Sequence, residues 1–265
     1  MKQCVRLLEF NCMAVLVLLL APAYALAGPG SEVLIVQGEL PQMKVLAEYL
    51  REDGQLDVTI ADHKQLPEDL TSYKAILVYT KGTLEEEAEI ALIDYTKNGG
   101  RFIGLHHAIS GAKLENTYYF DFLGIQIDSG LVEDGGFGFK HDITLALINL
   151  YPDHYITSHN VHWGERTAYT SSDSPGAERI LPAFSLHGTE VFINHRFTDG
   201  REKTVLCGFK YYDESAKRLY MQDRAAWVKK CGQGEIVYFM PGHVSSDYEN
   251  RNHVQMILNA IHWKP

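Results

Sequence analysis

The feature that most constrains the fold is the alternation of short apolar runs with amphipathic segments near the start of the chain. Four runs are apolar enough to be strands buried on both faces, at residues 32–36, 56–61, 75–79 and 101–105. Between them, residues 43–50 and 83–97 carry apolar side chains at helical spacing. Such alternation is typical of a parallel sheet that helices cover on both faces. We therefore predict an α/β fold with a doubly wound, mostly parallel sheet.

The helix predicted at 83–97 carries signals at both ends. Thr83 and Glu86 have the spacing of a capping box, which predicts that the helix begins close to Thr83. Gly99 and Gly100 provide the left-handed backbone at which helices commonly end. The next strand is therefore expected to begin directly after a tight turn.

The second half of the chain has a weaker pattern. Further strands are expected at 142–150, 190–197, 204–209, 225–229 and 235–240, and a closing helix at 250–263. Residues 160–179 are polar and contain glycine, serine and proline, which predicts a long loop or an inserted excursion. We find no internal repeat and no domain boundary in the sequence. One domain over residues 28–265, with additional C-terminal strands, is therefore expected.

The N-terminal segment, residues 1–27, has the pattern of a signal peptide. Lys2 and Arg6 precede an apolar run at 13–20, and an A-x-A cleavage pattern ends at Ala27. A run of this length is too short to span a bilayer. We expect export to the periplasm or the exterior, without stable membrane insertion after cleavage. An uncleaved N-terminal anchor is the alternative.

The charge balance restricts the partners of the chain. It has 24 Lys and Arg against 34 Asp and Glu, which gives a formal net charge of −10. Nucleic acids and anionic membrane surfaces are bound by basic patches, so we expect neither as a partner. A neutral small molecule is the expected partner, and the oligomeric state is left open.

The cysteines form a sparse set. Two of the four, Cys4 and Cys12, lie in the predicted signal peptide, which leaves Cys207 and Cys231. In an exported protein these two form either one disulfide or two free thiols, and the sequence leaves both alternatives open. There is no CxxC motif and no Cys/His spacing of a zinc site.

Two adjacent histidines, His106 and His107, follow the strand predicted at 101–105 directly, in the stretch GGRFIGLHHAISGA. In open α/β sheets, ligands bind beyond the carboxyl ends of the strands. The pair therefore lies where polar side chains are expected to act. The alternative is structural, since a histidine at a strand end often only hydrogen-bonds the neighbouring backbone.

Four stretches, in order, carry a resemblance to a known family. They are GGRFIGLHHA (99–108), DHYIT (153–157), LPAFSLHGTEVF (181–192) and GEIVYFMPGH (234–243), followed by a helix that ends in AIHW (260–263). The ordered set resembles the ThuA-like (trehalose utilisation) proteins, which are relatives of the class I glutamine amidotransferase-like fold. The resemblance implies a flavodoxin-like sheet and an action on a carbohydrate.

The resemblance also points to individual residues. His106 stands at the histidine of the family's GGxxxGxH strand end, and His154 at the histidine of its HP element. Glu190 stands at the acidic end of the family's DE pair, and His243 at its final GH. These positions are the candidates for a site inherited from the family.

The side chains at these positions restrict the chemistry. An amidotransferase carries a cysteine at a tight strand-to-helix elbow, but here the elbow reads GLHHAI and contains neither cysteine nor serine. A Cys-dependent amidotransferase is therefore excluded. Imidazole and carboxylate groups remain, and they serve either general acid–base catalysis or the binding of a divalent metal. We predict His106, Glu190 and His243 as catalytic residues and as the candidate ligands of zinc or another divalent ion.

Three further residues are predicted to bind the substrate: His107, His154 and Tyr119. Tyr119 belongs to an aromatic cluster at 118–120. Such a cluster either stacks against the C–H face of a sugar ring or packs in the core.

Two functions remain as alternatives. The first is an exported enzyme that processes a sugar by hydrolysis or elimination; Glu190 is its one candidate carboxylate, whereas glycosidases usually need two. The second is a non-catalytic module that binds a carbohydrate or docks a partner. Tyr155, where the family usually has proline, and Thr189, where it usually has aspartate, favour the second function.

Overall fold

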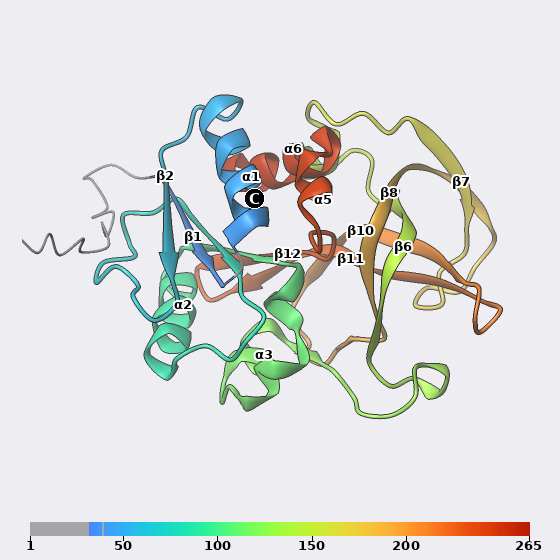
Figure 1. The fold of residues 1–265 in the computed structure, drawn as a ribbon, viewed down its shortest axis with the longest axis horizontal. Coiled ribbons are helices and arrows are strands. Elements are labelled where there is room, and N and C mark those ends of the chain that lie inside the picture. The colour runs from blue at the N-terminus through green and yellow to red at the C-terminus, as the bar shows by residue number, and fades with distance from the viewer. Residues whose placement is uncertain (1–31, 39) are drawn as a thin grey trace, which may run out of the picture.

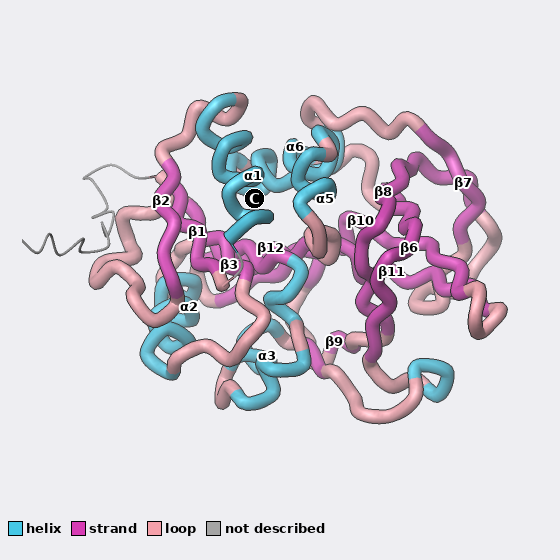
Figure 2. The backbone as a smooth tube through the Cα atoms, in the orientation of Figure 1, coloured by secondary structure: helices cyan, strands magenta, loops and turns pink. Residues whose placement is uncertain are grey.

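The computed structural model describes residues 32–38 and 40–265, so the predicted signal peptide at 1–27 lies outside the described residues. Ten strands form one continuous sheet in the order β2-β1-β3-β4-β12-β11-β10-β6-β8-β7. Helices surround one half of this sheet, whereas the other half carries mainly strands and loops (Figure 2). The α/β class is confirmed. No helix in the described ranges is long and apolar enough to cross a membrane.

One half of the sheet consists of parallel strands. These are β1 (Val33–Gln37), β2 (Val58–Asp62), β3 (Ala75–Tyr79), β4 (Arg101–Leu105) and β12 (Gly234–Phe239). Every residue of β3 is buried, which is the environment that its uniformly apolar sequence requires. The bounds of β3 and β4 are those expected from their apolar runs. The doubly wound part of the prediction is therefore confirmed.

Helices cover both faces of this parallel half. The longer ones are α1 (Leu40–Glu52), α2 (Glu86–Lys97) and α6 (Arg251–His262). The shorter ones are η1 (His106–Ile109), η2 (Gly111–Glu115), α3 (Tyr119–Leu123), α4 (Tyr155–Ser158) and α5 (Ser245–Glu249), whereas η3 (Val132–Asp134) lies beside the antiparallel strands. In Figure 1, α1, α5 and α6 lie above the parallel strands, and α2 and α3 lie below them. Asn250 caps α6, because its side chain accepts hydrogen bonds from the backbone N–H groups of Asn252 and His253.

The other half of the sheet is antiparallel from β12 onward. Its strands are β11 (Arg218–Cys231), β10 (Lys203–Asp213), β6 (Gly138–Asn149), β8 (Arg179–Ile193) and β7 (Glu165–Tyr169). These are the additional strands that follow the parallel part. Several are much longer than predicted, because their partly exposed residues give no continuous apolar run.

Two expectations about residues 160–197 need correction. Residues 160–179 are not only a loop, because they contain β7, which pairs with β8 at the edge of the sheet. The strand expected at 190–197 is the end of the long β8, and it stops at Ile193. The backbone then passes through Asn194 with a φ of 69° and continues as β9 (Arg196–Phe197), which pairs with β5 (Ile125–Gln126). An edge strand of mixed polarity carries a weak sequence signal, because its pairing with the neighbouring strand supplies the order.

The predicted capping box is also wrong. Helix α2 begins at Glu86, and its N-cap residue makes no side-chain hydrogen bond to the helix. Thr83 instead donates to the carbonyl oxygen of Ala112 at 3.2 Å and to Oε2 of Glu115 at 2.9 Å. The tertiary contact with η2 therefore takes precedence over the local cap.

The two cysteines of the described chain are free. Cys207 lies in the middle of β10 and pairs with Ala226, whereas Cys231 ends β11 and pairs with Gly234 of β12. Burial raises the pKa of both thiols. The disulfide alternative is therefore excluded in this structure.

Candidate metal centre and substrate pocket

His106 leaves β4 in an unusual backbone conformation. The strand is held between β3 and β12, and the next residue, His106, has a φ of 38°. Non-glycine residues in the left-handed region are uncommon and cost about 1–3 kcal/mol. Gly242 passes close by: a Cβ added to it would lie 3.3 Å from Cβ of His106. The surrounding fold therefore fixes the direction of this imidazole.

The hydrogen bonds of His106 define which ring nitrogen carries the proton. Nδ1 lies 2.6 Å from the carbonyl oxygen of Met240, and a carbonyl oxygen can only accept, so Nδ1 donates. Nε2 then faces Oε2 of Glu190 at 3.0 Å. Two lone pairs at that distance repel each other unless a proton or a cation lies between them. A backbone carbonyl that fixes the tautomer of a histidine in this way is a common feature of metal-binding histidines.

Glu190 reaches His106 from the antiparallel half of the sheet. In β8, Glu190 and Phe192 share one face, and the ring of Phe192 stacks on His106 with centroids 4.6 Å apart. Oε2 of Glu190 also lies 2.6 Å from Nδ1 of His243. This second contact lacks hydrogen-bond geometry, and within the described residues Nδ1 of His243 has no hydrogen-bond partner. The two groups therefore approach each other without forming an ordinary donor–acceptor pair.

His107 belongs to the same cluster. One ligand atom from each of His106, His107, Glu190 and His243 lies within 4.8 Å of the other three. We predicted His107 as a substrate-binding residue; it lines the neighbouring pocket and is also one of the candidate ligands. Burial, followed by the neighbouring His106 and His243, lowers the pKa of His107 to about 2. It is therefore neutral, which is the form that binds metals.

Glu190 is held as a carboxylate. Burial alone would raise the pKa of Glu190, but the neighbouring imidazoles of His106 and His243 outweigh burial and lower it. The cluster thus offers three imidazoles and one carboxylate. Nitrogen and oxygen ligands of this kind suit zinc and other divalent transition metals. The residues present therefore fit a divalent ion, and His106, Glu190 and His243 are the predicted set brought together here.

A pocket of about 630 Å³ opens beside the cluster. His107, Glu190 and His243 line its inner end. The remaining wall is largely apolar, with Lys81 and His141 as charged or titratable members. Its aromatic members are Phe137, Phe139 and Phe192. A pocket with apolar walls and a few convergent polar groups is typical of a small-molecule site.

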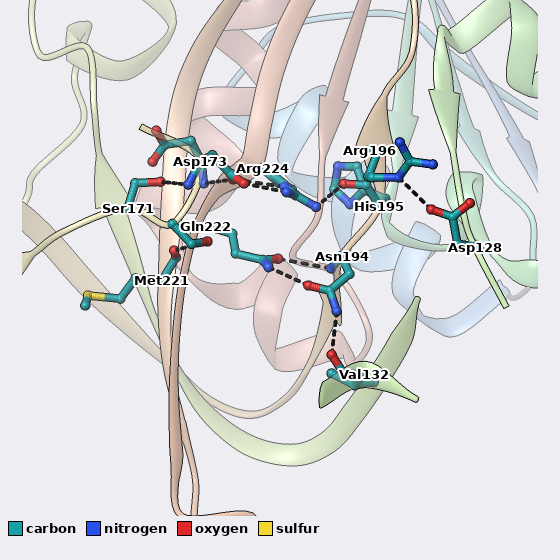
Figure 3. A network of polar contacts seen from close by, with 12 residues as sticks. Asp128, Val132, Ser171, Asp173, Asn194, His195, Arg196, Met221, Gln222 and Arg224 are labelled. Carbon is teal, nitrogen blue, oxygen red and sulfur yellow. Dashed lines mark hydrogen bonds and ion pairs between the residues drawn. The ribbon is translucent and has the colours of Figure 1, made fainter. Parts of the chain in front are cut away.

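Asn194 anchors one wall of this pocket by hydrogen bonds, and Figure 3 shows its side chain between those of Gln222 and Val132. Its side-chain amide donates to the carbonyl oxygens of Val132 and Gly136, both at 2.9 Å. Gln222 holds it in turn: Nε2 of Gln222 donates to Oδ1 of Asn194 at 2.6 Å, and the backbone N–H of Asn194 donates to Oε1 of Gln222 at 3.0 Å. Val132 and Phe137 line the pocket, so the Asn194–Gln222 pair holds that wall. In the sequence, the only indication of this role is that asparagine tolerates a left-handed backbone conformation better than most residues do.

The structure places the other two predicted substrate-binding residues elsewhere. Tyr119 is 1% exposed and packs against Phe102 and Phe122, so it belongs to the core. His154 caps α4 by accepting from the backbone N–H of Ile156, and its ring lies 5.1 Å from that of Trp263. Neither lines the pocket. His154 was predicted from a short family motif and Tyr119 from an aromatic cluster. In the structure, tertiary packing places both side chains away from the pocket.

Comparison with known proteins identifies the family. The family model ThuA, described as trehalose utilisation, matches residues 33–264. The chain belongs to the ThuA family. The match covers all elements that carry the cluster, from β4 to the loop after β12.

Two solved structures with TM-scores above 0.5 agree with this fold. A ThuA-like protein from Bacteroides uniformis ATCC 8492 has 15% sequence identity and a TM-score of 0.59, with 91% of this chain and 93% of that chain covered. A cytoplasmic protein from Salmonella typhimurium LT2 has 14% identity and a TM-score of 0.53, with 87% and 98% covered. A glutamine amidotransferase from Thermotoga maritima has 12% identity and a TM-score of 0.49, with 88% and 96% covered. No curated protein matches the chain. At these identities the first two structures indicate the fold alone.

Proposed function

We propose that this ThuA family protein is a divalent-metal-dependent enzyme that cleaves a carbohydrate by hydrolysis or elimination. The observation that carries the proposal is the convergence of His106, His107, Glu190 and His243, whose ligand atoms lie within 4.8 Å of one another at the end of a pocket. These residues come from three places in the chain. Such convergence is the geometry that a shared ligand requires.

A divalent ion in the cluster would polarise a sugar oxygen as a Lewis acid. The residues of the chain then divide the remaining tasks. His106 is wholly buried, and its Nδ1 proton is held by Met240, so its open Nε2 suits ligation rather than proton transfer. The side chain of His243 is 30% exposed, and it is the more accessible partner of Glu190. His243 or the ionised Glu190 can therefore exchange a proton with a substrate in the pocket.

The character of the pocket favours a saccharide. Phe137 and Phe192 lie with ring centroids 5.7 Å apart, and Phe139 is exposed at the wall. Aromatic rings bind the apolar C–H faces of sugars, while the imidazoles and the carboxylate can bind hydroxyl groups. The family description, trehalose utilisation, supports the same class of substrate. Export of the mature protein after cleavage near Ala27 is part of this proposal.

Cysteine chemistry has no support in the pocket. Cys207 is wholly buried within β10, and Cys231 lies at the far end of β11. Neither lines the 630 Å³ pocket. The proposed reaction therefore relies on the His/Glu cluster.

The experiment that tests the proposal combines metal binding with turnover. Purified protein is titrated with Zn²⁺ and Co²⁺ by calorimetry, and disaccharides such as trehalose are incubated with the loaded protein and analysed by mass spectrometry. We expect His106→Ala to abolish both metal binding and turnover. His154→Ala, which removes a partly buried histidine outside the cluster, should leave both unchanged.

Other outcomes separate the two functions. Sugar binding without turnover, unchanged in His106→Ala and His243→Ala, would support the non-catalytic carbohydrate module instead. Absence of metal binding in the wild-type protein would overturn the metal-dependent mechanism.

A further inference from the structure

Asp247 in α5 joins the two chain segments that carry Glu190 and His243. Its Oδ2 accepts a hydrogen bond from Oγ1 of Thr189 at 2.6 Å. The same oxygen accepts from the backbone N–H of Gly242 at 3.1 Å and from that of Val244 at 3.4 Å. Three donors from two separate segments therefore converge on one oxygen atom.

Each of these three donors belongs to a residue next to Glu190 or His243 in the sequence. Thr189 directly precedes Glu190, so the bond fixes the backbone that presents the carboxylate. Gly242 and Val244 are the two neighbours of His243, so Asp247 holds the backbone on both sides of His243. Glu190 and His243 approach each other to 2.6 Å, and this approach depends on how the two segments are joined.

The contact lies in the interior. Asp247 is 1% exposed, and Thr189 is wholly buried. Gly242 has a φ of 139°, and a Cβ added there would lie 2.3 Å from the hydroxyl of Tyr248, so the loop has no room to shift in that direction. Bonds to a buried carboxylate are charge-assisted and stronger than neutral ones. The junction is therefore stiff.

We propose that Asp247, through Thr189, is a positioning residue for the metal centre, and this inference rests on the proposed function of that centre. Groups behind the ligands of a metal orient them, and loss of such a group typically weakens metal binding about 10- to 100-fold. A local role as a turn cap needs only the N–H groups of Gly242 and Val244. The hydroxyl of Thr189, which comes from β8 on the other side of the site, is the contact that ties the cap to Glu190.

The test is a Co²⁺ titration of the full-length mature protein, followed by the visible absorption of the bound ion. Thr189→Val keeps the shape of the side chain but removes the donor, and it should bind Co²⁺ about 10- to 100-fold more weakly. Asp247→Asn should weaken binding in the same direction. Thr189→Ser restores the donor and should restore the affinity. Thr96→Val is the matched control, because Thr96 is also wholly buried and donates a 2.7 Å bond to Leu92, remote from the site.

Two results would overturn the inference. In the first, Thr189→Val binds Co²⁺ as tightly as the wild type while its melting temperature falls as far as that of Thr96→Val, which would leave Thr189 a purely structural role. The second result concerns the case in which the wild type binds no Co²⁺ and the proposed function fails, so that metal affinity can no longer test the inference. Ring ¹⁵N spectra of the metal-free protein then decide: Thr189→Val must shift the signals of His243, and unchanged signals would refute the positioning role.

Discussion

Nε2 of His106 lies 3.0 Å from Oε2 of Glu190, although 84 residues separate them and they come from the two different halves of the sheet. The same carboxylate oxygen lies 2.6 Å from Nδ1 of His243. The end of β4, the end of β8 and the loop after β12 therefore meet at one atom. In a doubly wound sheet this edge, beyond the carboxyl ends of the parallel strands, is where ligands bind.

The role of Glu190 as a ligand is tested by Glu190→Gln, which keeps the size of the side chain and removes its charge. We expect the affinity for Zn²⁺ to fall by more than about 100-fold, because loss of groups that merely orient ligands already costs about 10- to 100-fold. Calorimetry measures the change. Glu165→Gln, which alters a glutamate on the exposed edge strand β7, should bind Zn²⁺ like the wild type. An unchanged affinity in Glu190→Gln would remove the carboxylate from the ligand set.

The contact between Gly242 and His106 predicts a sensitive position. Gly242→Ala places a Cβ 2.3 Å from the hydroxyl of Tyr248, at a backbone φ of 139° that alanine rarely adopts. We expect a loss of about 1–3 kcal/mol in the free energy of unfolding, together with weaker metal binding. Gly200→Ala serves as the control, since an added Cβ there meets nothing within 4 Å. Equal stability of the two variants in urea unfolding would show that the packing around Gly242 is looser than described.

The pocket wall held by Asn194 gives a third prediction. Asn194→Gly keeps the left-handed backbone and removes both amide donors, so the carbonyl oxygens of Val132 and Gly136 lose their partners. We expect faster hydrogen exchange over residues 131–137 and a stability loss of about 1–3 kcal/mol. Asn160→Gly changes an exposed asparagine with a similar φ of 56° and should be nearly neutral. Unchanged exchange over 131–137 would contradict the anchoring role.

The buried lysine Lys113 predicts a pH dependence of stability. Nζ donates to the carbonyl oxygens of Thr80, at 2.8 Å, and Gly82. Burial lowers the pKa of Lys113 from its ordinary value of 10.5 to about 7. Between these values the unfolded chain binds more protons than the folded one, so the contribution of Lys113 becomes more favourable as the pH rises.

Lys113→Met removes this titration. The free energy of unfolding of the wild type, relative to Lys113→Met, should increase between about pH 7 and about pH 10. Urea unfolding across that range measures the difference. Lys64→Met, at an exposed lysine, should show no such trend. A flat difference for Lys113→Met would mean that the ammonium stays charged in the folded protein.

The parallel half of the fold was predictable because its strands are buried on both faces. The apolar runs at Ala75–Tyr79 and Arg101–Leu105 coincide with β3 and β4, since every residue of the two runs except Arg101 is buried. The edge strand β7 was missed because only Tyr169 of its residues is buried and its order comes from pairing with β8. The capping box at Thr83 failed because a tertiary partner, Glu115, competes for the hydroxyl.

The site was predictable only in part, for a similar reason. His106, Glu190 and His243 stand at strand ends and motif positions, so local sequence indicates them. The inclusion of His107 in the cluster depends on the left-handed turn at His106. Asp247 acts through contacts with residues as far as 58 positions away, and no local pattern records such a contact.

The central claim is that one divalent ion binds between imidazoles and a carboxylate drawn from both halves of the sheet. An anomalous difference map, recorded at the zinc absorption edge from crystals of the zinc-loaded protein, tests it most directly. The account predicts one strong peak about 2.0–2.2 Å from Nε2 of His106 and from an oxygen of Glu190, within reach of His243. A map with no peak at this cluster, or with zinc only elsewhere on the molecule, would contradict the account.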